Sequence, residues 1–261
     1  MSGDEFQEYD EDLMAVLEAI WGEGFMSPGG VDEVDRYLDG IDLGGQSVLD
    51  IGCGLGGVDL HLVRAHSAAQ VIGIDIEMPL IERCQKLASK YGLDDRIEFR
   101  CVEPGPLPFD DQSFDIVTSK DSIIHIADKH ALARDVARVL KPGGWFVASD
   151  WLAGYEGTPS PVMQAYLEAE GLDFGLASAE TYADALAAAG FEDIGVVDRN
   201  AWYRDVARVE RDRLAGELFD ELERTVGKEF ALHNVEIWDK MILALDEGGL
   251  RPTHLRGRKP A

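Results

Sequence analysis

The stretch 48–57, VLDIGCGLGG, contains the feature that decides the fold. An apolar run of strand length passes directly into a turn in which Gly52, Gly54 and Gly57 follow the pattern G-x-G-x-x-G, and a helical stretch comes next. Missing side chains at such a turn let a ligand approach backbone N–H groups at a helix N-terminus. Because any tight strand-to-helix turn also favours glycine, the pattern alone does not identify a ligand.

Outward from this turn, apolar runs of strand length alternate with helical stretches. Strands are predicted at QVIGIDI (70–76), IEFRCV (97–102), SFDIVTS (113–119), GGWFVASDW (143–151), FEDIGVVD (191–198) and LRPTHLRGRKP (250–260). Near-continuous apolar strands interleaved with helices predict a mostly parallel sheet covered on both faces, and hence an α/β protein.

The pattern changes at both ends of this alternation. Helical spacing before the first strand and again after Asp198 divides the 261 residues into four parts. We expect an N-terminal helical lid (1–40), a cofactor-binding core (41–200), a helical cap over the acceptor site (201–247) and a last strand of the core sheet (248–261).

The composition narrows the range of partners. Fifty acidic and 24 basic side chains give a net charge of −26, which disfavours nucleic acid and anionic membranes. No apolar run approaches the roughly 18 residues of a membrane helix, and the N-terminus lacks the form of a secretion signal. Three cysteines without metal or redox spacing favour a reducing cytoplasm and predict no metal site. We expect a monomer or a homodimer.

Two acidic residues indicate which cofactor the turn binds. Asp75 stands at the end of the predicted strand 70–76, where a carboxylate accepts hydrogen bonds from a ribose diol. Asp50 precedes Gly52 by two residues, and an acid there repels a pyrophosphate but suits an ammonium group. The ligand is therefore expected to be an adenosine joined to an amino acid rather than NAD.

These residues, with FDIV (114–117) and RVLKPGGWFVASDW (138–151), resemble the class I S-adenosylmethionine-dependent methyltransferases over roughly 46–151. The resemblance implies a Rossmann-like, seven-stranded sheet with an antiparallel last strand, S-adenosylmethionine as cofactor and S-adenosylhomocysteine as product. It also implies that Asp50, Gly52 and Gly54 hold the methionine part, and that Asp75 holds the ribose. Adenine is expected against Ile76, with Glu103 and Pro104 near its amine.

Three stretches of the sequence are similar to a narrower group within these methyltransferases. YDEDLMAVLEAIWGEGFMSPGG (9–30), DIGCGLGG (50–57) and SKDSIIHI (119–126) resemble phosphoethanolamine methyltransferases and their relatives, which include glycine, sarcosine and dimethylglycine methyltransferases. The resemblance implies that Tyr9 and His125 lie over the amine with Asp121 beside them. Ser27 is expected in the loop that closes over the cofactor, and Lys120 in the cofactor site.

The chemistry of methyl transfer suits His125. Transfer from a sulfonium is an in-line displacement, so an acceptor ammonium must first lose a proton, which histidine can take near neutral pH. Asp121, one helical turn earlier, is expected to face the same way and to orient the imidazole. Alternatively, Asp121 is a helix cap and His125 a core histidine. Aromatic residues either enclose a methylated ammonium or belong to the core: Trp21, Trp151, Tyr166 and Tyr203.

The positions at which this sequence differs from the phosphoethanolamine methyltransferases predict the acceptor. Glu170 stands where the phosphoethanolamine enzymes have an arginine, and Leu172 where they have a tyrosine, which argues against a phosphorylated amine. Arg199, Arg204 and Lys240 are candidates to pair with a substrate carboxylate. The sequence therefore predicts N-methylation of a small zwitterionic amine such as sarcosine or dimethylglycine, towards a betaine. Alternatives are a phosphoethanolamine-type N-methyltransferase, an S- or O-methyltransferase of a small metabolite, and a cofactor-binding protein without catalysis.

Overall fold

One seven-stranded sheet organises the protein, whose computed structural model describes residues 11–171 and 174–261. The strands are β1 (Ser47–Ile51), β2 (Gln70–Asp75), β3 (Ile97–Cys101), β4 (Phe114–Lys120), β5 (Leu140–Ala153), β6 (Glu192–Asp198) and β7 (Leu250–Arg258). They lie in the order β3-β2-β1-β4-β5-β7-β6, and β7 is antiparallel to both of its neighbours. The predicted Rossmann-like α/β fold with an antiparallel last strand is confirmed.

Helices follow or precede most strands. They are α1 (Glu11–Trp21), α2 (Gly30–Tyr37), α3 (Gly57–Arg64), α4 (Met78–Tyr91), α5 (Lys129–Val139), α6 (Pro161–Glu170), α7 (Ala179–Ala188), α8 (Asn200–Ala215), α9 (Phe219–Thr225) and α10 (Lys228–Glu247). None of the described helices is long and apolar enough to cross a membrane.

Each face of the sheet has its own hydrophobic core. Successive residues of a strand point to opposite faces, so Val48 of β1 packs with α2, α3 and α4, whereas Leu49 packs with α5 and α7. Both residues are buried. The near-continuous apolar strands seen in the sequence are the consequence of this two-sided burial.

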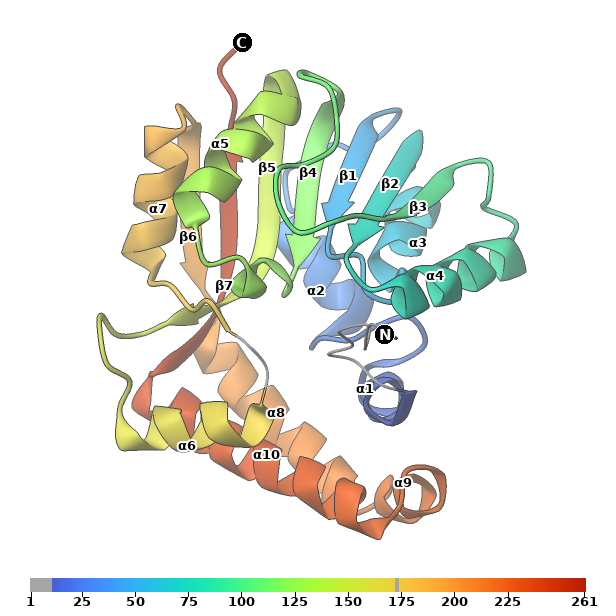
Figure 1. Ribbon diagram of the computed structural model, residues 1–261, viewed down its shortest axis with the longest axis vertical. Coiled ribbons are helices and arrows are strands. Elements are labelled where there is room, and N and C mark those ends of the chain that lie inside the picture. The colour runs from blue at the N-terminus through green and yellow to red at the C-terminus, as the bar shows by residue number, and fades with distance from the viewer. Residues whose placement is uncertain (1–10, 172–173) are drawn as a thin grey trace, which may run out of the picture.

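A third core lies beyond the carboxyl ends of the parallel strands. Helices α1, α6, α8, α9 and α10 form a layer there, below the sheet in Figure 1. Met163 and Tyr166 of α6 are buried in this layer, where α6 packs on α10. The helical layer therefore includes α6, which lies outside the expected cap range of 201–247.

A buried carboxylate ties α2 to the opposite edge of the sheet. Glu33 of α2 is 2% exposed and accepts hydrogen bonds from Arg199 Nε (2.8 Å) and Nη2 (3.0 Å), and its Oε1 lies 2.7 Å from His254 Nε2. Burial alone raises the pKa of Glu33, but the hydrogen bonds from His254 and Arg199 outweigh burial and lower the pKa to about 2. Arg199 is thus committed to a structural ion pair.

Replacing Arg199 by Ala is expected to destabilise the fold by about 3 kcal/mol, because it removes the guanidinium that forms two hydrogen bonds with the buried Glu33 carboxylate. The matched control is Arg204→Ala, which removes an exposed pair with Asp246 and is expected to cost less than about 1 kcal/mol. Urea unfolding monitored by circular dichroism measures both. In the wild type, the ionised Glu33 carboxylate stabilises the folded state because its pKa is lower there than in the unfolded chain. This contribution to the free energy of unfolding is complete above pH 4.5 and is lost as the pH falls towards 2. Equal stability of the two variants contradicts the prediction.

Candidate active site

The glycine turn after β1 lets two other segments approach closely. Gly52 has φ +73°, and a Cβ at this position would lie 1.7 Å from Ser122 Oγ, so no other residue fits. At Gly57 the N–H donates to Gly24 O (2.9 Å), and a Cβ would lie 2.5 Å from that oxygen. The glycines therefore bring the segment before α2 and the segment after β4 against the same turn.

A cavity opens between these segments at the carboxyl ends of β1, β2 and β4. Asp75 at the end of β2 lines it, and its carboxylate accepts hydrogen bonds from the N–H groups of Gly54 and Glu77, each at 3.1 Å. Burial raises the pKa of Asp75, although these backbone hydrogen bonds act in the opposite direction. The next side chain, Ile76, is 47% exposed and presents an apolar surface to the cavity. A carboxylate beside an apolar face fits a ribose joined to a base.

Six of the nine residues predicted to bind the cofactor line this cavity, which we call the cofactor cavity: Ser27, Gly52, Gly54, Asp75, Ile76 and Lys120. Glu103 and Pro104 are exposed and do not belong to its lining, because the chain turns away after β3. Val102, the residue before Glu103, lines the cavity instead. The expectation of an adenine contact from Glu103 therefore has no counterpart in the lining of the cavity.

Asp50 lies behind the glycine turn rather than in the cavity. It is 1% exposed, and its Oδ1 has no hydrogen-bond partner among the described residues. Burial is the main reason that its pKa rises to about 7, and the nearby charge of Asp75 raises it further. The expected direct contact between Asp50 and a ligand ammonium is thus absent from the lining of the described cavity.

Lys120, the last residue of β4, connects the N-terminal segment to the sheet. Its ammonium donates to Ser27 Oγ (2.6 Å), Pro28 O (2.8 Å) and Asp121 Oδ2 (2.8 Å). Three acceptors use all three donors of a lysine. The side chain is only 3% exposed, so this ion pair with Asp121 is shielded from solvent.

Asp121 and His125 do not lie on an α-helix as expected. Asp121 has φ +56°, and a single 3₁₀ turn, Ile123–His125, follows it. The Asp121 carboxylate accepts from Lys120 and from Ser149 Oγ (2.9 Å). It therefore binds Lys120 and β5, and the helical turn on which the expected pairing with His125 was based is absent. The His125 ring packs against Phe174, with ring centroids 5.4 Å apart.

The side chains of two buried residues, Lys129 and Asp150, bind the backbone of the turn that carries His125. Neither residue was predicted from the sequence to belong to the site. Lys129 Nζ donates to the carbonyl oxygens of Ile123 (2.8 Å), Ile124 (3.4 Å) and Ile126 (2.5 Å). Asp150 Oδ1 accepts from the N–H of Ile124 (3.1 Å). Burial lowers the pKa of Lys129 to about 8 and raises that of Asp150 to about 7. The two residues are 21 positions apart in the sequence, so no local pattern indicates that both bind the same turn.

A second cavity adjoins the cofactor cavity and extends into the helical layer; we call it the acceptor cavity. Among the described residues, both cavities are lined by Met26, Ser27, Asp121 and His125. His125 therefore stands at the junction of the two cavities. Tyr9, the other residue predicted to act on the amine, lies outside the described residues.

Aromatic side chains form much of the acceptor cavity. The four predicted aromatic residues Trp21, Trp151, Tyr166 and Tyr203 all line it, together with Phe174 and Trp238. Glu210 fixes several of them, since it accepts from Trp21 Nε1 (2.7 Å), Tyr203 OH (2.8 Å) and Trp238 Nε1 (3.2 Å). These rings are thus both core residues and cavity walls, so the two alternatives in the sequence analysis are compatible.

The charges around the acceptor cavity are negative. Asp121 and Glu170 line it, whereas no lysine or arginine of residues 11–171 and 174–261 does. Burial raises the pKa of Glu170 to about 7. The predicted cationic partners lie elsewhere: Arg199 pairs with Glu33, Arg204 with Asp246 and Lys240 with Glu236. The expectation that Arg199 meets a substrate carboxylate is wrong, because its guanidinium is already bound to Glu33.

Comparisons with known proteins agree with this architecture. Residues 49–148 match the family model described as a methyltransferase domain. The phosphoethanolamine N-methyltransferase of Triticum aestivum is 35% identical over 202 residues, which are 75% of this chain and 39% of that protein. Phosphoethanolamine N-methyltransferase 3 of Arabidopsis thaliana is also 35% identical, over 77% of this chain and 40% of its own length. The chain thus spans about two fifths of the length of these curated relatives.

Solved structures show the same fold. The Haemonchus contortus phosphoethanolamine N-methyltransferase 2, bound to phosphomonomethylethanolamine and S-adenosylhomocysteine, has a TM-score of 0.83 and 26% identity, and covers 97% of this chain and 59% of its own. A Galdieria sulphuraria structure described as a sarcosine dimethylglycine methyltransferase has a TM-score of 0.80 and covers 96% of this chain and 97% of its own. At 21% sequence identity, this similarity shows a shared fold and no more.

Replacing Asp75 by Asn is expected to weaken the binding of S-adenosylhomocysteine by about 5- to 150-fold, the equivalent of 1–3 kcal/mol for a lost charged hydrogen bond. Asn retains one acceptor oxygen and so keeps only one of the two hydrogen bonds from the N–H groups of Gly54 and Glu77; circular dichroism verifies that the variant is folded. Isothermal titration measures the affinity, and Asp95→Asn, at an exposed position outside the cofactor cavity, is the matched control. An unchanged affinity in Asp75→Asn excludes Asp75 as the ribose ligand.

Proposed function

Because this chain belongs to the class I S-adenosylmethionine-dependent methyltransferases, we propose that it methylates the nitrogen of a small amine bound in the acceptor cavity. S-adenosylmethionine supplies an electrophilic methyl carbon on a sulfonium sulfur. The residues of the chain then have three tasks, which are to hold the acceptor in line, to take its proton and to exclude water.

The observation that carries the proposal is the junction of the two cavities. Met26, Ser27, Asp121 and His125 line both of them, so a group bound on one side faces a group bound on the other. Displacement at carbon needs the acceptor lone pair in line with the bond that breaks, and two adjoining cavities meet this need. Lys120 supports the junction because it ties Ser27 and Asp121 together.

His125 is the residue that we propose to accept the proton. An ammonium has no lone pair, so its nitrogen attacks only after it has lost a proton, and an imidazole takes one near neutral pH. The contacts of Lys129 and Asp150 with the backbone fix the turn that carries the ring. Phe174 packs on the imidazole and limits its movement.

The carboxyl groups and rings of the acceptor cavity support a cationic acceptor. Lys120 balances the charge of Asp121, so Glu170 is the carboxyl group that an ammonium can pair with, and the surrounding aromatic faces attract a methylated ammonium by cation–π contact. A single substrate carboxylate adds one negative charge, whereas a phosphate monoester adds close to two. The described part of the cavity therefore penalises a phosphorylated amine more than a sarcosine- or dimethylglycine-like amine.

Phosphoethanolamine is the second candidate acceptor, and the comparisons favour it over the zwitterionic amine. Relatives at 35% identity carry the name phosphoethanolamine N-methyltransferase, and the Haemonchus structure at 26% identity contains phosphomonomethylethanolamine. The similarity to the sarcosine dimethylglycine enzyme, at 21% identity, concerns the fold alone and does not indicate the acceptor. Both candidates present an amine nitrogen, so the proposed role of His125 is the same for either.

A labelled-methyl assay tests the proposal. We expect transfer from S-adenosylmethionine to at least one amine among sarcosine, dimethylglycine, ethanolamine and phosphoethanolamine, and none to a thiol or a phenol. In His125→Ala we expect turnover to fall by about a hundredfold or more, while the affinity for S-adenosylhomocysteine changes less than about twofold.

Three results of this assay contradict the proposal or the role it gives to His125. Transfer to a thiol or phenol alone excludes N-methylation. Full turnover in His125→Ala shows that another residue takes the proton. A parallel loss of turnover and cofactor affinity in that variant indicates that His125 shapes the cofactor cavity instead.

Glu170→Arg tests how the cavity discriminates against phosphate. A guanidinium in place of the carboxylate is expected to raise kcat/KM for phosphoethanolamine relative to ethanolamine by about tenfold or more, because charge-assisted hydrogen bonds to phosphate replace repulsion. Glu168→Arg, on the same helix but exposed and outside the lining, is the matched control. An unchanged ratio in Glu170→Arg contradicts a role of Glu170 in selecting the acceptor.

A further inference from the structure

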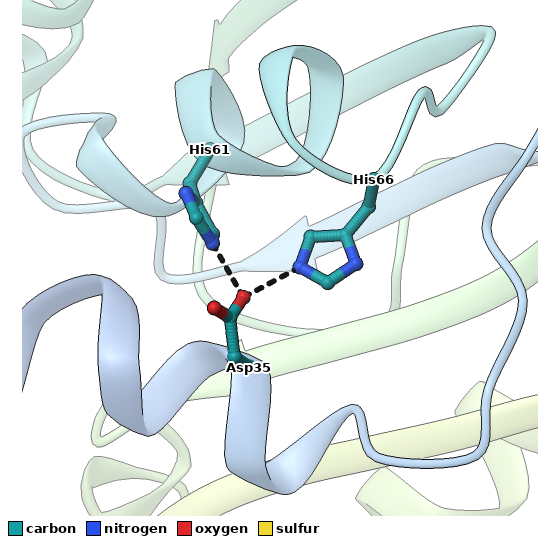
Figure 2. Close-up of side chains that lie close together, drawn as sticks. All are labelled: Asp35, His61 and His66. Atoms are coloured by element: carbon teal, nitrogen blue, oxygen red, sulfur yellow. Dashed lines mark hydrogen bonds and ion pairs between the residues drawn. The ribbon is translucent and has the colours of Figure 1, made fainter.

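Three side chains on the surface converge away from both cavities. Asp35 lies on α2, His61 on α3, and His66 just beyond the end of α3. The Nε2 atoms of the two histidines lie 2.6 and 2.7 Å from the same carboxylate oxygen, Asp35 Oδ1, as Figure 2 shows. One ligand atom from each of the three side chains lies within 4.8 Å of the other two.

The chemistry of this cluster matches that of a transition-metal site. Imidazole nitrogen and carboxylate oxygen bind Zn²⁺ at about 2.0–2.2 Å, so neighbouring ligand atoms of a tetrahedral site are roughly 3.3 Å apart. The present separations of 2.6 and 2.7 Å need to open by only a fraction of an ångström for an ion to enter between the ligands. Asp35 has the freedom for this movement, because its side chain is 52% exposed.

The types of ligand in this cluster also restrict which ion it can bind. Two imidazoles in the ligand set favour Zn²⁺, Ni²⁺ or Cu²⁺ over Mg²⁺ and Ca²⁺, which prefer oxygen ligands alone.

We propose that Asp35, His61 and His66 form a binding site for a divalent transition metal of the Zn²⁺ class. The three protein ligands leave a fourth position to water. None of these residues lines the cofactor cavity or the acceptor cavity, so the site is independent of the proposed methyl transfer. It also departs from the sequence analysis, which expected no metal site.

A metal at this position links two elements that lead to the cofactor cavity. The segment Gly24–Ser27, which lines that cavity, precedes α2, and the glycine turn that lines it leads into α3. An ion held by Asp35 on one side and by His61 and His66 on the other joins α2 to α3. Its binding energy therefore adds to the stability of the fold.

Titration of ZnCl₂ into the untagged, chelator-treated 261-residue chain tests the site. We expect one Zn²⁺ per chain and a rise in Tm with added Zn²⁺. The affinity is expected to fall by about tenfold or more in His61→Gln and in His66→Gln, since even outer-shell losses cost 10- to 100-fold. Asp35→Asn is the third variant, and circular dichroism verifies that each variant is folded.

His130→Gln and His233→Gln are the matched controls, because both histidines are exposed and lie on other helices. They are expected to bind Zn²⁺ like the wild type. Zn²⁺ binding that is equal in all variants assigns the ion to other groups on this acidic protein and overturns the proposal. No binding to the folded wild type overturns it as well, and so does binding of Mg²⁺ as tight as that of Zn²⁺.

Discussion

The buried ammonium group of Lys120 is the interaction on which the rest of the site depends. A buried cation retains its charge only if its donors are satisfied, and Lys120 satisfies all three with Ser27 Oγ, Pro28 O and Asp121 Oδ2. These acceptors belong to the N-terminal segment and to the end of β4. One side chain therefore fixes the distance between the segment that covers the cofactor cavity and the turn that carries His125. The junction of the two cavities is a consequence of this constraint.

Buried carboxyl groups give the site its electrostatic character. Glu33 has strong cationic partners and a lowered pKa, whereas burial raises the pKa of Asp50, Asp150 and Glu170 to about 7 each. Asp50 and Asp150 lie beneath the cofactor turn and the His125 turn, and Glu170 lines the acceptor cavity. A cation bound near such a carboxyl group lowers its pKa and so favours the ionised form, which agrees with a sulfonium cofactor and an amine acceptor. This property distinguishes the described cavity from one built to hold a phosphate.

Much of the site followed from local patterns in the sequence. The turn at Gly52 and Gly54 was predictable because close approach of backbone and ligand excludes side chains. Asp75 was predictable because the carboxyl ends of parallel strands meet at one edge of the sheet. Arg199 was predicted wrongly, since its partner Glu33 is 166 residues away in the sequence and no local pattern reveals it. Asp121 was misjudged because its carboxylate binds the neighbouring Lys120 and also Ser149, which is 28 residues away in the sequence.

The sequence alone determined how strands and helices alternate along the chain, because this follows from the periodicity of apolar residues. Glycine positions determined the cofactor turn, and composition determined the acidic character of the protein. Tertiary structure decided which side chains meet. It brought α6, α8 and α10 together as the wall of the acceptor cavity, paired Arg199 with Glu33, and set Asp35 against one histidine of α3 and another just after this helix. Such contacts join residues that are distant along the chain, and packing of the whole fold, rather than local propensity, selects them.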